Sequence, residues 1–599
     1  MLPQTFHPII RNWFTETYGK PTPVQAEAWP LIERGENVLA LAPTGSGKTL
    51  TAFLSAISRF CPGVQKQYNP EELSALYVSP LKALNEDIKR NLLVPLAAIR
   101  QRFEEENIAF PSIRVETRSG DTPQSHRRRF FINPPSILAL TPESLSILLL
   151  NPKGRQVLSG VKYLIIDEIH AVLGNKRGSF LSCQIERLVS TAGEFQRISL
   201  SATVRNPQAA ADFSGGIGRQ VRIVSPAAEK LIDLSVEYPP IEIKTEHDTI
   251  RRLNEGRYTP LINYILKRIH EGSTLLIFTD TRRRAERMCY FLNQTAAKNY
   301  AHNSNEKTDR AFSNTVAFPH HGSLSKEIRR SVEKGLAEGR IPCVVATASL
   351  ELGIDMGCVD EVVLAGSTGS VSQALQRIGR AGHGVGQISK SKLFAFHEMD
   401  LLLAAAIKEA VDERDIEEIY PIENPLDILA QFVLALCCEK NRNIDDLYEL
   451  VKKCYIFRNL NYDSFNRVVY MLAGLSFSEK NAGNDKNEEP SRLREIKPRI
   501  WLDKKENTIG ALDGTTTLLY TSGGVIANRG AYSLRLADGT KIGELDEAFV
   551  WERRLGDCFD FGARGWRVTN ITAEAMEVVP LENRADSIPF WEGDRQFRS

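Results

Sequence analysis

Short apolar runs alternate with amphipathic stretches over the first third of the chain. Between about residues 38 and 224 these runs are NVLALAPTG, SALYVSP, SILALTPE, VKYLIIDE and RISLSAT. Each is followed by a turn and then by a stretch that is apolar on one side. Short apolar strands that alternate with helices predict a parallel sheet covered on both faces. We therefore expect an α/β domain here.

The same pattern begins again after a connection at residues 225–238. The second set of runs is STLLIFTD, TVAFPHHG, IPCVVATA and VDEVVLAG, which predicts a second α/β domain. From about residue 422 to 474 the apolar residues recur with helical spacing, as in PLDILAQFVLALCC and IDDLYELVKKC. This change of period indicates a small helical module.

The last part of the chain has a different character. Residues 478–497 are polar and charged, which is typical of an exposed linker. The runs TTLLYTSGG, AYSLRLADG, AFVWERRLG and WRVTNIT follow, separated by Gly and Asp turns, and they predict short strands. The chain ends in the polar segment FWEGDRQFRS without an obvious closure of this domain. We therefore expect a truncated domain or further chain beyond Ser599.

These patterns predict four domains. Residues 1–228 and 229–418 form the two α/β domains, residues 419–497 the helical module with its linker, and residues 498–599 the β-rich domain. The fold class is therefore α/β, with two tandem parallel sheets followed by a helical and a β-rich part.

Composition excludes some classes of protein. The 599 residues are 42% hydrophobic and 25% charged, which suits several globular cores, and no segment approaches the ~20 apolar residues that span a bilayer. We expect a cytoplasmic protein without a membrane partner. The nine cysteines include no C-x-x-C pair, so no zinc site is expected. The net charge of +1 means that a polyanion would be bound by local clusters.

A phosphate-binding loop follows the first predicted strand. APTGSGKT stands between that strand and a predicted helix, which is the context such a loop requires. Its glycines let backbone N–H groups face phosphates, Lys48 reaches the β and γ phosphates, and Thr49 is suited to Mg²⁺. The expected nucleotide contacts are Thr44, Gly45, Ser46, Gly47, Lys48 and Thr49.

Two carboxylates end another predicted strand. In YLIIDEIH, Asp167 and Glu168 would leave the carboxyl edge of the sheet, where ligands bind in such folds. Asp167 is expected to hold Mg²⁺ together with Thr49. Glu168 is placed to polarise the attacking water during ATP hydrolysis. Lys48, Asp167 and Glu168 are thus the expected catalytic residues of the first domain.

These and other motifs resemble helicase superfamily two. PTPVQ resembles the adenine-reading motif, DEIH motif II, Ser201-Ala202-Thr203 motif III, ATASLELGID motif V and QALQRIGRAGH motif VI. The resemblance implies that both α/β domains are RecA-like lobes of an ATP-dependent helicase. It also implies that Gln25 contacts the base, and that Gly353 and Asp355 contact the nucleotide.

Motif VI, in the second lobe, contains two arginines that could provide positive charge at the ATP site. The resemblance implies that Gln376, Arg377 and Arg380 complete the ATP site as catalytic residues. Arginine neutralises charge on the transferred phosphoryl group, which is worth ~10³–10⁵ in rate in comparable enzymes. Closing the two lobes around ATP and opening them after hydrolysis would drive a motor.

More narrowly, the chain resembles the Lhr (large helicase-related) family of superfamily 2 DNA helicases. The supporting segments are PTPVQAEAWP, SPLKALN, DEIH, QRIGRAGH, ELDEAFVWERRLGD and PFWEGDR. This resemblance implies that the helical module is a winged-helix module and that the β-rich domain is of the Lhr type. His383 agrees with the Lhr pattern but stands where the wider superfamily often has arginine.

Superfamily two helicases hold one strand through phosphate and sugar contacts, for which hydroxyls and backbone amides at loop ends are suited. In the first lobe the expected nucleic-acid contacts are Ser79, Pro80, Lys82, Asn85, Gly120, Asp121, Thr122, Thr141, Pro142 and Glu143. In the second lobe they are Thr279, Arg282, His321, Gly322, Ser323 and Thr347. Trp566, beside two glycines and two arginines, is expected to stack on a base.

The expected function is an ATP-dependent helicase that tracks single-stranded DNA, with 3′-to-5′ polarity implied by the family, and unwinds DNA or RNA–DNA duplexes in DNA repair. Its expected cofactors are ATP and Mg²⁺, and its oligomeric state is left open. Two alternatives remain at this stage. One is an RNA-remodelling helicase, and the other is an ATP-gated nucleic-acid clamp that does not unwind.

Overall fold

The structure is a computed structural model, and it divides the chain into two compact units. Unit 1 comprises residues 1–228 and 418–527, and unit 2 comprises residues 229–417 and 528–599. The residues described are 2–43, 45–62, 69–80, 88–118, 130–226, 231–239, 258–302, 315–351, 359–382, 388–476, 496–522, 524, 531–546, 549–550, 552–572, 575–581, 585 and 587–590.

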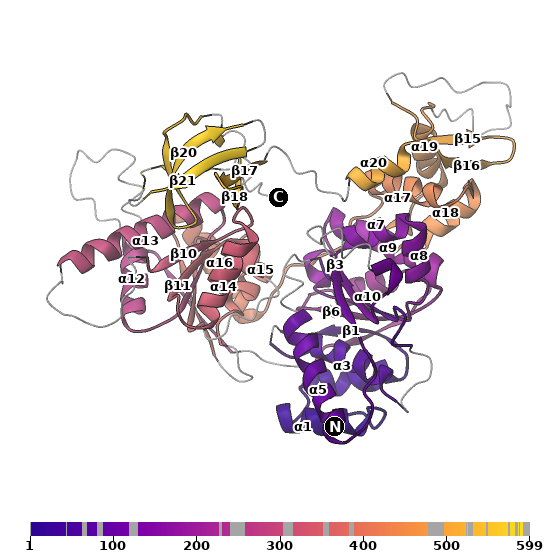
Figure 1. Ribbon diagram of the computed structural model, residues 1–599, viewed down its shortest axis with the longest axis horizontal. Helices are drawn as coiled ribbons and strands as arrows, with labels where there is room; N and C mark the ends of the chain where they lie inside the picture. Colours follow the sequence, from indigo (N-terminus) through magenta and orange to yellow (C-terminus); the bar gives the residue numbers. More distant parts are fainter. Residues whose placement is uncertain are drawn as a thin grey trace. The chain divides into compact units, whose positions relative to one another are not determined.

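Unit 1 is built on a seven-stranded parallel sheet (Figure 1). In spatial order the strands are β3 (Val115–Arg118), β4 (Ile137–Leu140), β2 (Ala75–Val78), β5 (Tyr163–Ile166), β6 (Gln196–Ser201), β1 (Asn37–Leu41) and β7 (Val221–Val224). Their apolar side chains alternate between two cores, with Leu39 and Leu41 on one face and Val38 and Ala40 on the other. Burial on both faces explains why the strands are nearly continuously apolar.

Helices cover both faces of this sheet. One core contains residues of α1 (Pro8–Tyr18), α2 (Pro23–Glu33), α3 (Lys48–Phe60) and α5 (Val94–Glu105). The opposite core contains residues of α7 (Pro142–Leu150), α8 (Pro152–Leu158), α9 (Lys176–Ala192) and α10 (Pro207–Gly215). All five runs predicted as strands in this domain are strands, which confirms the first α/β domain.

The helical module belongs to unit 1 and shares its core. It consists of α17 (Leu426–Glu439), β14 (Arg442–Asn443), α18 (Ile444–Lys452), α19 (Tyr462–Leu472), β15 (Ile500–Asp503), β16 (Thr508–Ala511) and α20 (Thr515–Ser522). Helices α17, α18 and α19 with the small antiparallel sheet of β14, β15 and β16 form the expected winged-helix arrangement. Arg187 of α9 is fully buried against Glu439 of α17, with Nε donating to Oε1 at 2.8 Å.

Two expectations for this region are wrong. The β-rich domain was expected to begin at residue 498, but β15 and β16 pair with β14 and therefore belong to the helical module. The run TTLLYTSGG was expected to be a strand, yet it forms α20, which packs against α17 and buries Leu519. A short apolar run does not distinguish strand from helix until its packing partner is known.

Unit 2 contains a second parallel sheet, with six strands (Figure 1). Their spatial order is β10 (Ala317–His320), β11 (Cys343–Ala346), β9 (Leu275–Phe278), β12 (Glu361–Ala365), β13 (Ser389–Phe394) and β8 (Ile232–Glu237). One face is covered by α12 (Thr259–His270) and α13 (Arg282–His302), the other by α14 (Lys326–Ala337), α15 (Val371–Ile378) and α16 (Glu398–Glu413). The second α/β domain is confirmed, with β8 arising from the predicted connection.

The β-rich part is a five-stranded sheet that packs on this second lobe. Its strands are, in spatial order, β18 (Lys541–Asp546), β17 (Ala531–Leu536), β21 (Ala575–Pro580), β20 (Arg564–Ile571) and β19 (Cys558–Phe561). Two backbone hydrogen bonds attach it to the segment after β10. Ser325 N donates to Ile542 O, and Glu544 N donates to Ser323 O, both at 2.7 Å.

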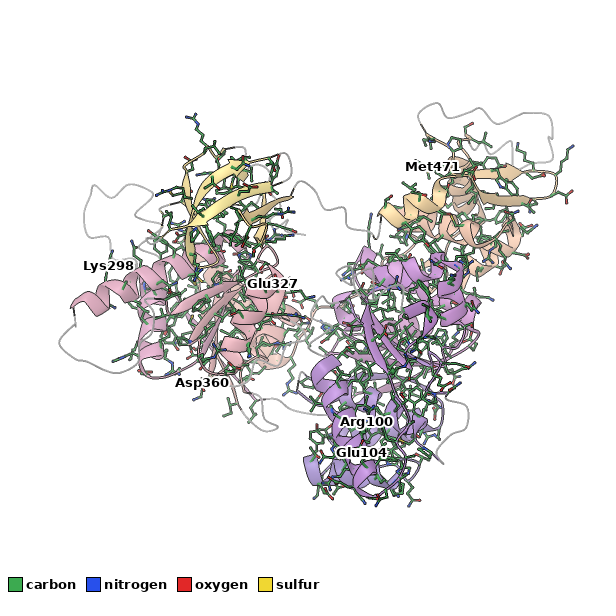
Figure 2. All side chains as sticks on the ribbon, in the orientation of Figure 1. Arg100, Glu104, Lys298, Glu327, Asp360 and Met471 are labelled. Carbon is green, nitrogen blue, oxygen red and sulfur yellow. The ribbon has the colours of Figure 1, made fainter. Side chains whose placement is uncertain are left out.

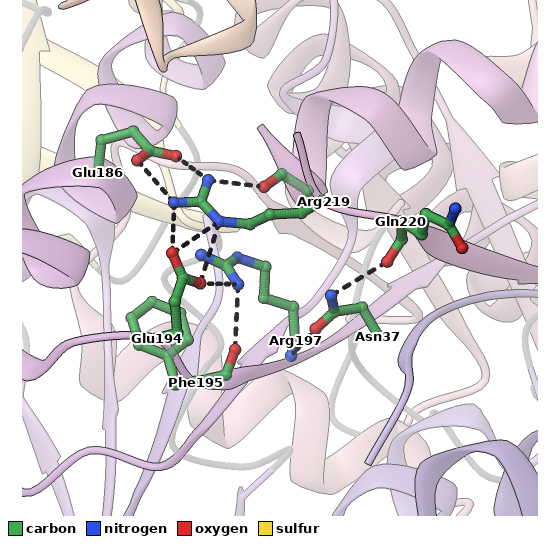
Figure 3. A network of polar contacts seen from close by, with 8 residues as sticks. Asn37, Glu186, Glu194, Phe195, Arg197, Arg219 and Gln220 are labelled. Carbon is green, nitrogen blue, oxygen red and sulfur yellow. Dashed lines mark hydrogen bonds and ion pairs between the residues drawn. The ribbon is translucent and has the colours of Figure 1, made fainter. Parts of the chain in front are cut away.

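A charged network holds β6 at the end of the sheet away from its carboxyl edge (Figure 3). Arg219 forms ion pairs with Glu186 at 2.7 Å and with Glu194 at 2.8 Å, and Arg197 reaches Glu194 at 3.2 Å. Arg197 is also anchored through its backbone N–H, which donates to Asn37 Oδ1 at 2.9 Å. Because each buried charge has an opposite charge beside it, the network fixes the position of β6 against α9 and β1.

The surface of the protein also carries charged side chains. Arg100 and Glu104 on α5, Lys298 on α13 and Glu327 on α14 are exposed (Figure 2). Among the described residues, no helix is both long enough and apolar enough to cross a bilayer.

Two ion pairs join α9 to α17, and they should differ in their contribution to stability. Replacing Glu439 by Ala leaves fully buried Arg187 without its carboxylate, so we expect the free energy of unfolding to fall by about 3 kcal/mol. Replacing Lys176 by Ala removes an ion pair with Asp427 whose side chains are 54% and 52% exposed, and should cost less than about 1 kcal/mol. Urea denaturation followed by tryptophan fluorescence measures both; equal losses would contradict the expectation.

Candidate nucleotide and nucleic-acid sites

The predicted motifs of unit 1 leave one edge of its sheet. All seven strands are parallel, so the loops that follow them emerge at the same carboxyl edge. In spatial order these loops begin with Thr141 after β4, Ser79 after β2, Asp167 after β5, Ala202 after β6 and Ala42 after β1. The nucleic-acid candidates therefore occupy one part of the edge and the nucleotide candidates the adjoining part.

The loop after β1 has the backbone of a phosphate-binding loop. Gly45 and Gly47 both have φ of +81°, a left-handed conformation that favours glycine. At Gly47 a Cβ atom would lie only 2.6 Å from Gln25 Nε2, so a larger residue does not fit. The ammonium group of Lys48 is buried and donates to the carbonyl oxygens of Ala42 and Pro43, the latter at 2.8 Å. The loop thus curls around Lys48 at the first turn of α3.

The predicted adenine-reading residues support this loop from the side. Thr22 Oγ1 donates to Ser46 O at 2.8 Å, and Gln25 Nε2 donates to Gly47 O at 3.4 Å. Gln25 Oε1 also accepts from Thr22 N at 2.9 Å. Gln25 therefore positions the loop; its contact with the base remains a prediction.

Asp167 is a buried carboxylate facing the same loop. The hydroxyl of Tyr77 donates to Asp167 Oδ2, and Glu168 N donates to Asp167 Oδ1 at 2.8 Å. Burial and then the negative charge of Glu168 raise the pKa of Asp167 to about 6, which Tyr77 and Lys48 partly offset. Glu168 has a φ of +52°. A left-handed backbone is uncommon for a residue other than glycine, and here it falls within motif II.

These residues fit a magnesium nucleotide. The glycine loop and the N-terminus of α3 suit phosphate oxygens, and the buried carboxylate of Asp167 with the hydroxyl of Thr49 offers the oxygen ligands that Mg²⁺ prefers.

His170 connects motif II to motif III. Its Nδ1 accepts from Ala202 N at 3.1 Å and lies 3.2 Å from Ser201 Oγ and 3.5 Å from Glu168 Oε2. Burial, followed by the charge of Lys48, lowers the pKa of His170 to about 4, so the ring is neutral near pH 7. A neutral ring can accept at Nδ1, as this geometry requires. His170 therefore contacts both Glu168 of motif II and the residue that follows β6.

Motif VI is anchored on Glu351 within unit 2. Arg377 Nε donates to Glu351 Oε1 at 2.6 Å, and its guanidinium lies 5.2 Å from the centre of the Phe278 ring. Arg380 instead contacts the backbone of Glu351, with NH2 donating to its carbonyl oxygen at 2.7 Å. Gln376 Nε2 contacts Ser372 Oγ at 3.5 Å. Arg377 thus pairs with the Glu351 carboxylate, and Arg380 donates to the Glu351 backbone.

Two of the predicted nucleic-acid contacts of unit 1, Pro80 and Glu143, bind the same arginine. Arg177, in the first turn of α9, donates Nε to Glu143 Oε1 at 2.6 Å and NH2 to Glu143 Oε2 at 2.9 Å. Its NH1 group donates to the carbonyl oxygen of Pro80. Ser79, Thr141 and Pro142 are buried beside these groups at the ends of β2 and β4.

The candidates of unit 2 also lie together, at the carboxyl ends of β9, β10 and β11. Thr279 N donates to Ala346 O at 2.8 Å, and Thr347 N donates to His320 O at 3.2 Å. Arg282 NH1 donates to Ser323 Oγ at 2.9 Å. The structure therefore brings Thr279, Arg282, Ser323 and Thr347 to one edge.

The β-rich sheet covers part of this group. His321 is fully buried, its Nε2 lies 2.9 Å from Glu286 Oε1, and the same carboxylate accepts from Gly562 N at 3.0 Å. Ser323 is also buried, whereas Gly322 is exposed. Of the His321-Gly322-Ser323 segment, the backbone at Gly322 is thus the part that a strand could reach.

The stacking prediction for Trp566 is wrong. This side chain is 5% exposed, lies in the core of the β-rich sheet, and donates its indole N–H to Phe561 O at 2.8 Å. The alternation along β20 points Trp566 and Val568 into that core and Arg567 outward, while Arg564 is exposed at the start of the strand. The exposure of these arginines therefore did not indicate that of Trp566.

Several predicted contacts lie outside the described residues: Thr44, Lys82, Asn85, Gly120, Asp121, Thr122, Gly353, Asp355 and His383. Three residues that the sequence did not single out have clear places in the sites. They are Tyr77 beside Asp167, Glu351 beside the arginines of motif VI, and Arg177 between the loops at Ser79–Pro80 and Thr141–Glu143. Each acquires its place through a contact with a residue distant in the chain.

Three family models match parts of this chain. The family model described as DEAD/DEAH box helicase matches residues 22–211, and that of the helicase conserved C-terminal domain matches residues 257–384. The model of the large helicase-related protein winged helix domain matches residues 409–588. It therefore spans both the winged-helix module and most of the β-rich sheet.

Individual relatives match over almost the whole chain. The Lhr helicase of Mycolicibacterium smegmatis is 39% identical over 98% of this chain and 39% of its own length. The ATP-dependent helicase Lhr-Core protein 2 of Thermococcus barophilus is 37% identical over 97% of this chain and 64% of its own length. The chain thus spans about two fifths to just under two thirds of these relatives.

A solved structure shows the same likeness in three dimensions. It is the helicase Lhr of Mycobacterium smegmatis bound to ssDNA and AMP-PNP, which is 37% identical with a TM-score of 0.75. The match covers 93% of this chain and 68% of that one. With the sequence relatives and the winged-helix match, it shows that the chain belongs to the Lhr family of large helicase-related proteins.

Proposed function

We propose that this chain is an ATP-dependent helicase that tracks single-stranded DNA in the 3′-to-5′ direction and unwinds DNA or RNA–DNA duplexes, in the setting of DNA repair. The observation that carries the proposal is the pairing of a curled glycine loop around Lys48 with the buried carboxylate of Asp167 at one sheet edge. The Lhr relatives named as helicases, one of them bound to ssDNA and AMP-PNP, support the choice of activity and strand.

In this proposal the first lobe binds and activates ATP. The N–H groups around Gly45 and Gly47 bind phosphate oxygens, while Lys48 exchanges its carbonyl partners for the β and γ phosphates. Mg²⁺, when held by Thr49 and Asp167, neutralises charge on the phosphates. Glu168 accepts a proton from the attacking water.

The second lobe supplies positive charge to the same reaction. Arg380, whose NH2 group donates to the carbonyl oxygen of Glu351, is the proposed donor to the γ phosphate, as the resemblance of motif VI implies. Arg377 is neutralised by the Glu351 carboxylate and holds motif VI in place. ATP thus favours a closed arrangement of the lobes, and hydrolysis releases it, which would move the lobes along a bound strand.

The first test of this chemistry is Glu168→Gln, which keeps the size of the side chain and removes its basic oxygen. We expect the rate of ATP hydrolysis to fall by about 10² or more, while binding of ATP and of single-stranded DNA is retained. Steady-state hydrolysis and fluorescence anisotropy measure these quantities. The matched control is Glu104→Gln, an exposed glutamate on α5, which should hydrolyse ATP at the normal rate. Normal turnover by Glu168→Gln would refute its role.

The two arginines of motif VI should separate into catalysis and structure. Arg380→Ala is expected to lower the rate of ATP hydrolysis about 10³-fold. Arg377→Ala should lower the unfolding temperature, because it leaves the buried Glu351 carboxylate unpaired. Arg340→Ala, which removes an exposed arginine of the same lobe, is the control. Identical behaviour of Arg377→Ala and Arg380→Ala would contradict the separation.

Strand displacement decides between a helicase and a clamp. The protein should displace the complementary strand from 3′-tailed DNA and RNA–DNA duplexes, and not from 5′-tailed ones, in an ATP-dependent reaction followed by gel electrophoresis. Glu168→Gln serves as the inactive control. ATP hydrolysis without displacement would indicate an ATP-gated clamp, and displacement from RNA duplexes alone would indicate RNA remodelling.

A further inference from the structure

Arg177 lies where two nucleic-acid loops and the ATP site adjoin. The loops at Ser79–Pro80 and Thr141–Glu143 follow β2 and β4, which are neighbours in the sheet. The hydrogen bond from Ser79 N to Leu140 O, at 3.1 Å, joins the two strands where these loops begin. Among the residues that the structure describes, a further link between the two loops passes through Arg177.

The guanidinium of Arg177 supplies that link. Two of its nitrogens bind the two carboxylate oxygens of Glu143, and the third donates to the carbonyl oxygen of Pro80. A bidentate fork fixes the plane of the guanidinium, which a lysine ammonium does not do. Arg177 thereby joins the two loops in a defined geometry.

This ion pair differs from an ordinary surface pair. The side chains of Arg177 and Glu143 are 25% and 26% exposed. Burial raises the pKa of Glu143, but the hydrogen bond and charge of Arg177, together with hydrogen bonds to its own backbone and to Thr141, outweigh burial and hold that pKa below its usual value. Glu143 is therefore charged near pH 7.

Arg177 is also joined rigidly to motif II. Asn175 caps α9, its Oδ1 accepting from Arg177 N at 3.0 Å and from Gly178 N at 3.1 Å. A Cβ atom at Gly178 would clash with the carbonyl oxygen of Val172, so the chain leaving motif II passes directly against the first turn of α9. This short segment therefore connects Glu168 and His170 to Arg177.

We propose that Arg177 is a positioning residue that couples the state of the ATP site to the two loops holding the strand, by clamping Pro80 and Glu143 from the start of the helix that follows motif II. This inference rests on the proposed function, because it assumes that the loops bind nucleic acid. Without this clamp, the two loops would move independently, and the affinity for the nucleic-acid strand would no longer depend on the bound nucleotide.

The test compares three variants: Arg177→Ala, Arg177→Lys and Lys176→Ala. Lys176 is the matched control, since it is the adjacent cation on the same turn and pairs with Asp427 instead of the loops. ATP hydrolysis is measured against the concentration of single-stranded oligothymidylate. Arg177→Ala is expected to raise the half-activating concentration about tenfold, with the KM for ATP and the rate at saturating oligonucleotide near normal. Arg177→Lys should recover only part of this loss.

A second measurement addresses coupling directly. Binding of the same oligonucleotide is measured by anisotropy with and without AMP-PNP. The nucleotide-dependent change in affinity should persist in Lys176→Ala and disappear in Arg177→Ala, whereas a purely structural role would lower the unfolding temperature and leave that ratio unchanged. If Arg177→Ala and Lys176→Ala behave alike while the normal protein is stimulated by DNA, Arg177 has no such role. If the normal protein is not stimulated at all, the proposed function fails instead.

Discussion

The parallel pairing of β4, β2, β5, β6 and β1 is the constraint on which both sites of unit 1 depend. Because these strands run in one direction, five loops far apart in the chain meet along one edge. The order of the strands then decides which loops adjoin. This order places the loops of the predicted nucleic-acid contacts beside motif II, motif II beside motif III, and motif III beside the glycine loop.

Polar contacts, not strand hydrogen bonds, fix the geometry beyond that edge. Asp167 is held by Tyr77, motif III by His170, and motif VI by Glu351. In each case a buried charged or polar group has defined hydrogen-bond partners, and losing one of them would leave the group only partly satisfied. Such contacts fix the positions of the loop residues, although the loops are not part of the sheet.

The two accessory parts attach to different lobes by different means. The winged-helix module joins unit 1 through a shared apolar core and the Arg187–Glu439 ion pair. The β-rich sheet joins unit 2 through backbone hydrogen bonds at Ser323 and Ser325 and through Glu286, which contacts both His321 and Gly562. Each accessory part is therefore fixed to one lobe, so it follows the movement of that lobe.

The sequence by itself determined the two parallel sheets, the phosphate-binding loop and the acidic pair of motif II. Apolar runs of strand length define those sheets locally, and the glycine loop requires only neighbouring residues between a strand and a helix. Tertiary structure decided the rest. Trp566 is in a core, TTLLYTSGG is a helix, and Arg177 clamps Pro80 and Glu143, because burial, packing partners and ion pairs all depend on residues distant in the chain.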